Sequence, residues 1–265
     1  MTFHEQFDLI QQEHNINKTK DFLLNYLETS IKEHREEDII ICLNETIGFF
    51  RDIEDFTNSS KYAKSLANLL NKIDINPDAI FVSFINIANA FRANKEYDLA
   101  KSYFMKALNI YNENNLDNKS DLAALYNNLG LMYQNIDLDN AINYFNQAIN
   151  LIKDINQVLR LGITYINLSY SYLGKNDINN LKKYLDLAFD IFNNFKDDFH
   201  YSSLLALNAK YLYLIKEYDK SYKFYKLALS HFDKFQGRSE TYFNLYGEFK
   251  KVCEILNYPS FLLMI

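Results

Sequence analysis

Asparagine recurs along this chain at intervals of 39 to 42 residues, and each copy is followed five residues later by an aromatic ring. The five pairs are Asn44/Phe49, Asn86/Phe91, Asn128/Tyr133, Asn167/Tyr172 and Asn208/Tyr213. A period of this length is typical of repeat architectures, in which each unit buries its apolar face only against its neighbours. The pattern therefore predicts a solenoid with one working surface.

A second set of positions keeps the same register. In each of four units a small or aliphatic residue is followed four residues later by a large aromatic or aliphatic side chain and seven residues later by alanine. The sets are Ala100, Phe104 and Ala107; Ala141, Phe145 and Ala148; Leu181, Leu185 and Ala188; and Ser221, Tyr225 and Ala228. This spacing places the three side chains on one face of a helix. Each unit is therefore predicted to contain two helices, the first carrying the asparagine.

The composition favours helices throughout. The chain of 265 residues contains only 6 Gly and 2 Pro, whereas strands joined by tight turns usually need more of both. Short polar turns separate the two predicted helices of each unit, and each turn has an Asp or Asn where the second helix needs an N-cap. We expect an all-α protein.

At this level of detail the chain resembles the tetratricopeptide repeat family. The segments Phe84-x-x-Ile87-Ala88-x-x-Phe91 and Tyr126-x-x-Leu129-Gly130-x-x-Tyr133, each followed by its small/aromatic/small set, carry the resemblance. It covers roughly residues 37–235. The family's usual Trp is replaced by Phe or Tyr, and the period is stretched, as in kinesin-light-chain-like and peptide-sensing members. The resemblance implies a right-handed superhelix whose first helices line a concave groove.

The expected organisation has three parts. Residues 1–36 are expected to form N-terminal capping helices, over Thr2–Glu13 and Lys18–Arg35. Residues 37–235 are expected to form about five helix pairs, and residues 236–265 a capping helix and tail. The first pair is the most degenerate in its pattern. Its second helix is expected only at Lys61–Lys72, with the set Ala63, Ala67 and Leu70, after a longer connection through residues 55–60.

The asparagine column is the first candidate site: Asn86, Asn128, Asn167 and Asn208, with Asn44 as a weaker member. A carboxamide has two donors and an acceptor, which suits the backbone of an extended peptide. The resemblance implies the same, since asparagines at this position hold peptide backbones in similar repeat proteins. The alternative is that these side chains bridge adjacent helices or face solvent.

Apolar residues flank the column and predict a trough for hydrophobic anchors of a peptide or helix. They are Val82, Ile85, Ile163, Ile166, Tyr170 and Tyr211, and Asn89 is expected on the same face. A groove filled by the protein's own terminal helix is the competing interpretation. Arg51 and Arg92 lie one repeat apart and are candidate anion contacts, although such arginines more often cap helix C-termini.

The groove type that clamps chaperone C-termini is not expected. By the resemblance, its neutral positions correspond to Asn89 and Asn128, but Ile85, Ile163 and Asn167 replace its basic residues. Without those cations a terminal carboxylate would be poorly held.

Several other classes of function find no support. The net charge of −6 argues against nucleic-acid binding. The five histidines are scattered, no phosphate loop or nucleophile elbow occurs, and Asp197-Asp198-Phe199-His200 is read as a turn rather than a metal site. The sequence lacks a secretion signal and a membrane span, and Cys42 and Cys253 are expected as buried free thiols. We expect no cofactor, no metal and a cytoplasmic location.

The sequence thus predicts a non-catalytic module that holds a peptide or partner segment in its groove. The alternative is a regulator that responds to a peptide or ligand and acts through protein contact, since no DNA-binding domain is expected. An apolar tail at residues 259–265 and the rings of Phe243, Tyr246 and Phe249 favour a homodimer slightly.

Overall fold

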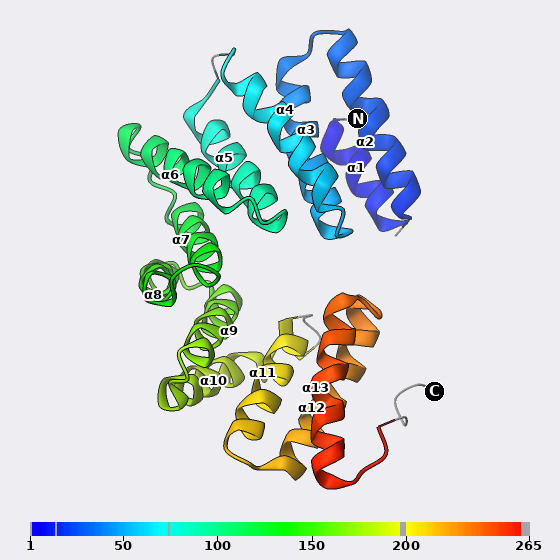
Figure 1. The fold of residues 1–265 in the computed structure, drawn as a ribbon. Coiled ribbons are helices and arrows are strands. Elements are labelled where there is room, and N and C mark those ends of the chain that lie inside the picture. Colours follow the sequence, from blue (N-terminus) through cyan, green and yellow to red (C-terminus); the bar gives the residue numbers. More distant parts are fainter. Residues whose placement is uncertain (1, 14, 74, 197–199, 261–265) are drawn as a thin grey trace. The chain divides into compact units, whose positions relative to one another are not determined.

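The computed structural model describes residues 2–13, 15–73, 75–196 and 200–260, and within them the only regular secondary structure is helix (Figure 1). The helices are α1 (Phe3–Gln12), α2 (Ile16–Lys32), α3 (Glu36–Asp52), α4 (Phe56–Leu70), α5 (Pro77–Ala93), α6 (Tyr97–Glu113), α7 (Lys119–Tyr133), α8 (Leu138–Asp154), α9 (Val158–Gly174), α10 (Ile178–Phe192), α11 (His200–Leu214), α12 (Tyr218–Gln236) and α13 (Glu240–Leu256). The all-α prediction is confirmed.

The chain divides into two compact units, unit 1 (Met1–Met132) and unit 2 (Tyr133–Ile265). In unit 1, α3 packs against α4, α5 against α6, and α2 against α3; in unit 2, α9 packs against α10 and α11 against α12, with α13 against α12. Each helix thus contacts mainly its neighbours in sequence, as a repeat architecture requires. We call α3, α5, α7, α9 and α11 the first helices, and α4, α6, α8, α10 and α12 the second helices.

The predicted small/aromatic/small positions lie where α6, α10 and α12 pack against α5, α9 and α11, and the equivalent positions of α8 are buried as well. The side chains of Ala100, Phe104 and Ala107 in α6, and of Ala141, Phe145 and Ala148 in α8, are fully buried. Their equivalents in α10 and α12 are at most 3% exposed. Alanine lets two helix backbones approach closely, and the ring between the alanines fills the remaining space at interior packing density.

The structure corrects the expected form of the first pair. The segment 55–60 is not a long connection, because α4 already begins at Phe56 with Asp55 as its N-cap. Ser59 is fully buried and donates a hydrogen bond to the carbonyl of Ile47 on α3, with an Oγ–O distance of 2.9 Å. The prediction took Ser59 as part of a polar connection, whereas it is a buried residue inside α4.

With Ser59 as the first buried position of α4, the first pair follows the same repeat register as the other pairs. Ser221 in α12 makes the equivalent hydrogen bond to the carbonyl of Ala209, at 2.8 Å. Ser59, Ala100, Ala141, Leu181 and Ser221 then follow one another at intervals of 40 or 41 residues. This column is more regular than the asparagine column, and Ser59, Ala63 and Leu66 replace the set expected in residues 61–72.

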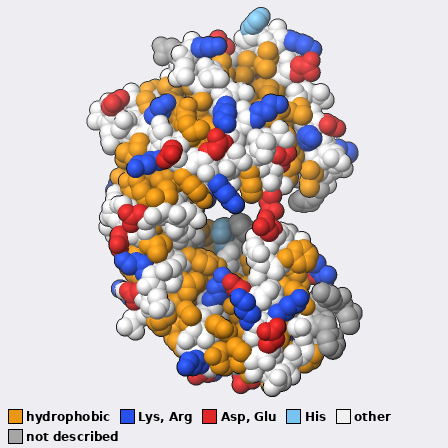
Figure 2. Space-filling model, in the orientation of Figure 1, with side chains coloured by type: hydrophobic (Ala, Val, Ile, Leu, Met, Phe, Trp, Pro, Cys, Tyr) orange, Lys and Arg blue, Asp and Glu red, His pale blue; other side chains and the backbone are white. Residues whose placement is uncertain are grey.

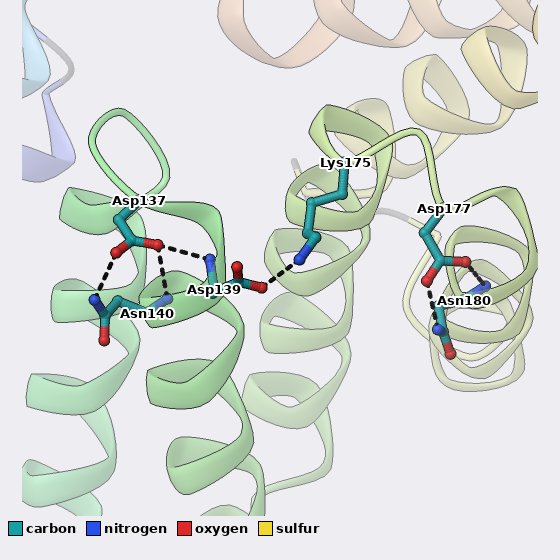
Figure 3. Close-up of polar contacts among 6 residues, drawn as sticks. All are labelled: Asp137, Asp139, Asn140, Lys175, Asp177 and Asn180. Carbon is teal, nitrogen blue, oxygen red and sulfur yellow. Dashed lines mark hydrogen bonds and ion pairs between the residues drawn. The ribbon is translucent and has the colours of Figure 1, made fainter.

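The predicted aspartate caps are present at α8 and α10, as Figure 3 shows; α4 also has an aspartate cap, Asp55, which was not expected. Asp137 accepts hydrogen bonds from the backbone N–H groups of Asp139 and Asn140, and Asp177 accepts one from Asn180. In both cases the asparagine side chain also donates to the aspartate, at 2.7 Å. The prediction is wrong for α6 and α12, whose N-cap positions hold Glu96 and Glu217 without a side-chain capping bond.

At the C-terminal ends of helices, where glycine is common, this chain uses other residues in the left-handed conformation. Within the part of the chain that the structure describes, eight non-glycine residues at the ends of helices adopt a left-handed conformation, with φ between 50° and 64°: His34, Glu54, Lys95, Asn115, Asn156, Asn176, Lys216 and Asn257. After Lys95, for example, the N–H of Glu96 bonds to the carbonyl of Phe91 at 2.8 Å and closes the end of α5.

The capping aspartates predict a specific acid sensitivity. Hydrogen bonds from Asn58, Asn140 and Asn180 lower the pKa of Asp55, Asp137 and Asp177 respectively. A carboxyl whose pKa is lower in the folded state stabilises the fold above its unfolded pKa, about 4, and this contribution is lost as pH falls through the folded value.

The matched control replaces all three aspartates by asparagine, which caps helices well but does not titrate. Below about pH 4, the stability of the wild type should fall more steeply with decreasing pH than that of the triple variant. Thermal melting between pH 2 and pH 6 measures this, and parallel curves would contradict the assignment.

Candidate functional site

The structure joins two members of the asparagine column. Asn44 on α3 donates through Nδ2 to the carbonyl of Ile40 at 3.0 Å and to Ser83 Oγ on α5 at 2.9 Å. Asn86 on α5 donates through Nδ2 to Asn44 Oδ1 at 2.8 Å. These two carboxamides bridge neighbouring first helices, which is the structural alternative to a binding role.

The bridge fixes the orientation of both amides. A carbonyl oxygen only accepts, so the group of Asn44 that faces Ile40 must be its nitrogen. Asn44 Oδ1 therefore faces Asn86, whose nitrogen must be the donor. Asn44 uses both N–H groups and its oxygen in this way, whereas Asn86 keeps its Oδ1 and its second N–H for other partners.

The other three asparagines differ in their surroundings. Asn128 on α7 and Asn208 on α11 are half-buried, and their side chains make no hydrogen bond within the described residues. The backbone carbonyl of Asn167 on α9 accepts a hydrogen bond from Gln134 Nε2 at 2.6 Å, and the same nitrogen donates to Ser171 Oγ at 3.0 Å. We call the sides of the first helices that carry these five asparagines the first-helix face, considered separately in each unit.

Three predicted contact residues lie in the interior. Ile85 is 9% exposed, Asn89 is 7% exposed and Ile166 is 3% exposed. The expectation that they offer surface to a partner is wrong because helices such as α5 are covered by α3, α4 and α6 together. Val82, at 43% exposed, and the half-buried Ile163 remain accessible.

Tyr170 and Tyr211 are half-buried in unit 2. The Tyr170 hydroxyl donates to the carbonyl of Ser203 at 3.4 Å, and burial raises its pKa. Beside it, Lys210 Nζ pairs with Glu248 Oε1 at 3.0 Å, and Tyr225 donates to Glu248 Oε2 at 3.3 Å. Tyr170, Lys210 and Glu248 line a small cavity of about 160 Å³ between α9, α11 and α13.

A larger cavity of about 660 Å³ opens on the first-helix face of unit 1. Its walls come from α1, α2, α3 and α5, and include Phe7, Gln11, Asn15, Ile16, Thr19, Asn44, Glu45, Gly48, Phe49, Arg51, Asp52 and Asn86. The volume lies within the range of cavities that hold small ligands. The predicted residues Asn44, Asn86 and Arg51 thus meet at one cavity, together with Glu45 and Gly48, which sequence reasoning missed.

Gly48 is unusual because it lies in the middle of α3 without a packing reason. A Cβ at this position would meet only Arg51 Nη2, at an ordinary contact distance of 3.9 Å. Since glycine inside a helix costs about 1 kcal/mol relative to alanine, Gly48→Ala should raise the free energy of unfolding by about 0.5–1 kcal/mol. Urea denaturation measures the change, and a loss of stability would mean that the space above Gly48 is needed for the fold.

A buried glycine provides the matched control. A Cβ on Gly162 in α9 would lie 2.9 Å from Ile191 and 3.0 Å from Phe192. Gly162→Ala should therefore destabilise the protein under the same conditions, although the propensity change is identical.

Arg51 and Arg92 lie near one another at the ends of α3 and α5. Burial, followed by the charge of Arg51, lowers the pKa of Arg92, and Arg92 Nε is buried without a hydrogen-bond partner within the described residues. Among the described residues, the Arg51 guanidinium forms an ion pair with Asp52, at an Nη2–Oδ1 distance of 3.5 Å. Their expected role as anion contacts stays a prediction.

One pair resembles catalytic chemistry but lies in the interior. Ser202 Oγ and His231 Nδ1 are 2.6 Å apart, and His231 Nε2 lies 2.8 Å from the carbonyl of Lys196. Ser202 is fully buried, so no substrate reaches its hydroxyl, and the contact ties α11 to α12. The tract 197–200 lies outside the described residues except for His200, and no metal-ligand cluster occurs among the described ones.

Charge and hydropathy add two observations. On the face shown in Figure 2, Lys and Arg side chains are interspersed with Asp and Glu and form no continuous basic surface. None of the described helices is both long and apolar enough to span a bilayer.

Both cysteines are buried and free, and burial raises the pKa of Cys42 to about 12.

Comparison with known proteins supports the repeat assignment. The family model described as tetratricopeptide repeat matches residues 80–154, which cover most of α5 and all of α6, α7 and α8. No curated protein sequence matches the chain. The predicted resemblance is therefore confirmed over these residues, and the fold is the helical-repeat fold of tetratricopeptide solenoids.

Solved structures share this fold at low sequence identity. NprR in complex with its cognate peptide NprX is 17% identical, with a TM-score of 0.64 over 89% of this chain and 72% of that chain. Aspartyl phosphate phosphatase F from Bacillus subtilis is 14% identical, with a TM-score of 0.65 over 96% and 69%. A putative kinesin light chain with TPR-like repeats from Podosopora anserina is 13% identical, with a TM-score of 0.57 over 74% and 96%.

Proposed function

We propose that this protein is a non-catalytic binding module of the cytoplasm that holds an extended peptide, or an extended segment of a partner protein, on its first-helix face. The fold supports an interaction role, since repeat proteins of this kind include a structure solved with a bound peptide. Exposed apolar residues such as Val82 would receive hydrophobic side chains of the peptide.

One observation carries the proposal. Asn128 and Asn208 occupy equivalent turns of their first helices, are half-buried, and leave their carboxamides unused by the described residues. Because these carboxamides are half-buried and not used by the fold, their donors and acceptor remain available to a bound partner. The backbone of an extended peptide offers both an N–H and a C=O, so it can satisfy such a carboxamide regardless of its own sequence. Asn44 uses both N–H groups and its oxygen within the fold and is expected to contribute to stability instead, whereas Asn86 keeps its Oδ1 for a further partner.

The experiment is a selection from random 12-residue peptides displayed on phage with free amino termini. The wild-type chain should enrich peptides that bind with Kd values at or below the micromolar range, and the same selection with an Asn128→Ala/Asn208→Ala variant should enrich them poorly. Failure of the wild type to enrich any peptide would contradict the proposal.

The possible homodimer stays a prediction. Of the three α13 rings on which the dimer prediction rests, Tyr246 and Phe249 are buried, at 8% and 1% exposed, and Phe243 is open to contact, at 57%. The Tyr246 hydroxyl donates to the carbonyl of Ser260 at 2.9 Å, so the start of the tail folds back onto α13. Residues 261–265 lie outside the described residues.

A further inference from the structure

The carboxylate of Glu45 has no partner in the large cavity of unit 1. It is half-buried on α3, and no described residue forms a hydrogen bond or ion pair with it. Burial raises the pKa of Glu45; the nearby His4 opposes this effect, and Asp8 and Asp52 reinforce it. A partly desolvated carboxylate without a partner is unfavourable, and a bound cation relieves this cost.

The remaining charges in the cavity wall do not compensate Glu45. Two carboxylates, Glu45 and Asp52, and one cation, Arg51, line the cavity. Arg51 is already paired with Asp52 at 3.5 Å, which leaves the single negative charge of Glu45. The cavity therefore favours a ligand group with one positive charge.

Asn86 supplies a hydrogen-bonding group next to this charge. Its Nδ2 is directed to Asn44, so its Oδ1 is available as an acceptor at the same cavity. A carboxylate and a neutral acceptor on neighbouring helices match a group with several N–H donors. In a peptide, the terminal ammonium lies directly beside the first backbone N–H, whereas the ammonium of a lysine side chain is separated from the backbone by four methylene groups.

The cavity also has room for the first residue of a peptide. Gly48 leaves open space beside Glu45 on α3, at a position where alanine would make a more stable helix. Phe7 and Phe49 add apolar walls for a side chain.

We propose that the cavity of unit 1 binds the free amino terminus of the peptide, with the Glu45 carboxylate as the counter-ion of the terminal ammonium and Asn86 Oδ1 as acceptor for the adjacent backbone N–H. This inference rests on the proposed function and adds to it the polarity of the bound peptide. It distinguishes this protein from grooves that clamp a terminal carboxylate.

The probe is a peptide selected from the phage library, synthesised with a free and with an acetylated amino terminus. Acetylation removes the ammonium charge and should weaken binding to the wild type by at least about tenfold, as expected for a charge-assisted hydrogen bond. Glu45→Gln should weaken binding of the free peptide by a similar factor. The acetylated peptide should then bind the wild type and Glu45→Gln within about threefold of each other, because the two changes remove one interaction.

The matched control is Glu37→Gln, the same chemical change at an exposed position of the same helix outside the cavity. It should bind both peptides as the wild type does. Thermal melting of Glu45→Gln verifies that the fold is intact.

The outcomes separate the two claims. If no peptide is selected, the proposed function itself fails. If peptides bind but acetylation leaves their affinity unchanged, the function stands and the assignment of the amino terminus is overturned. It is overturned equally if replacement of a peptide lysine by norleucine, rather than acetylation, abolishes the effect of Glu45→Gln.

Discussion

Replacing Phe145 with alanine should lower the free energy of unfolding by about 3–5 kcal/mol, the usual cost of removing a large ring from a packed interior. Phe145 is fully buried in α8, between Ala141 and Ala148 on the same helix face. The side chains of these two alanines are too short to fill the space that the ring of Phe145 would leave. The loss of contacts and the remaining cavity therefore both count against the folded state.

Urea denaturation followed by far-UV circular dichroism measures this change. Phe243→Ala is the matched control, because that ring is 57% exposed on α13 and its removal should change stability by less than about 0.5 kcal/mol. A small effect of Phe145→Ala would show that the seam between paired helices is not the main source of stability.

Adding volume to the same seam should also destabilise the protein. Ala148→Leu places three further carbon atoms at a fully buried position where two helices approach, and should cost about 1–3 kcal/mol. Ala107→Leu tests the equivalent position of α6 in unit 1. The control is Asn150→Leu, which adds a leucine at an exposed position of α8. Unchanged stability in both alanine variants would mean that the repeat register is wrong.

The seam was predictable from sequence because its positions obey a local rule. A helix that packs against a neighbour on each repeat needs small residues at fixed intervals, and Ala100, Ala141 and their equivalents follow that period. The first pair was mispredicted for an equally local reason. Ser59 and Ser60 have the composition of a turn, and only the carbonyl of Ile47 on another helix makes a serine suitable for the interior.

The candidate site was predictable only in part. The recurrence of asparagine correctly located the first helix of each pair. It could not predict that the side chain of Asn44 bonds to Ser83, 39 residues away, because that contact depends on how α3 packs against α5. Ile85 and Ile166 were expected as open surface because a helical period does not reveal how many neighbours enclose a helix. The cavity beside Glu45 depends on α1 and α2, which carry no repeat signature; an isolated glycine within a helical pattern, Gly48, was the available signal.

The central claim is that the first-helix face of this repeat protein binds a peptide through carboxamides that the fold itself does not need. The most direct test titrates one selected 12-residue peptide calorimetrically into the wild type, Asn128→Ala, Asn208→Ala and Asn86→Ala, and melts the same four samples. If the peptide binds unit 1, Asn128→Ala should weaken binding by about 0.5–1.5 kcal/mol, or roughly 2- to 12-fold; if it binds unit 2, Asn208→Ala should do so. Both variants should keep melting temperatures close to that of the wild type. Asn86→Ala should lower the melting temperature, because Asn44 Oδ1 then loses its donor, although Asn44 keeps its bond to Ser83. The claim is contradicted if Asn128→Ala and Asn208→Ala lower the melting temperature while the affinity for the peptide stays unchanged.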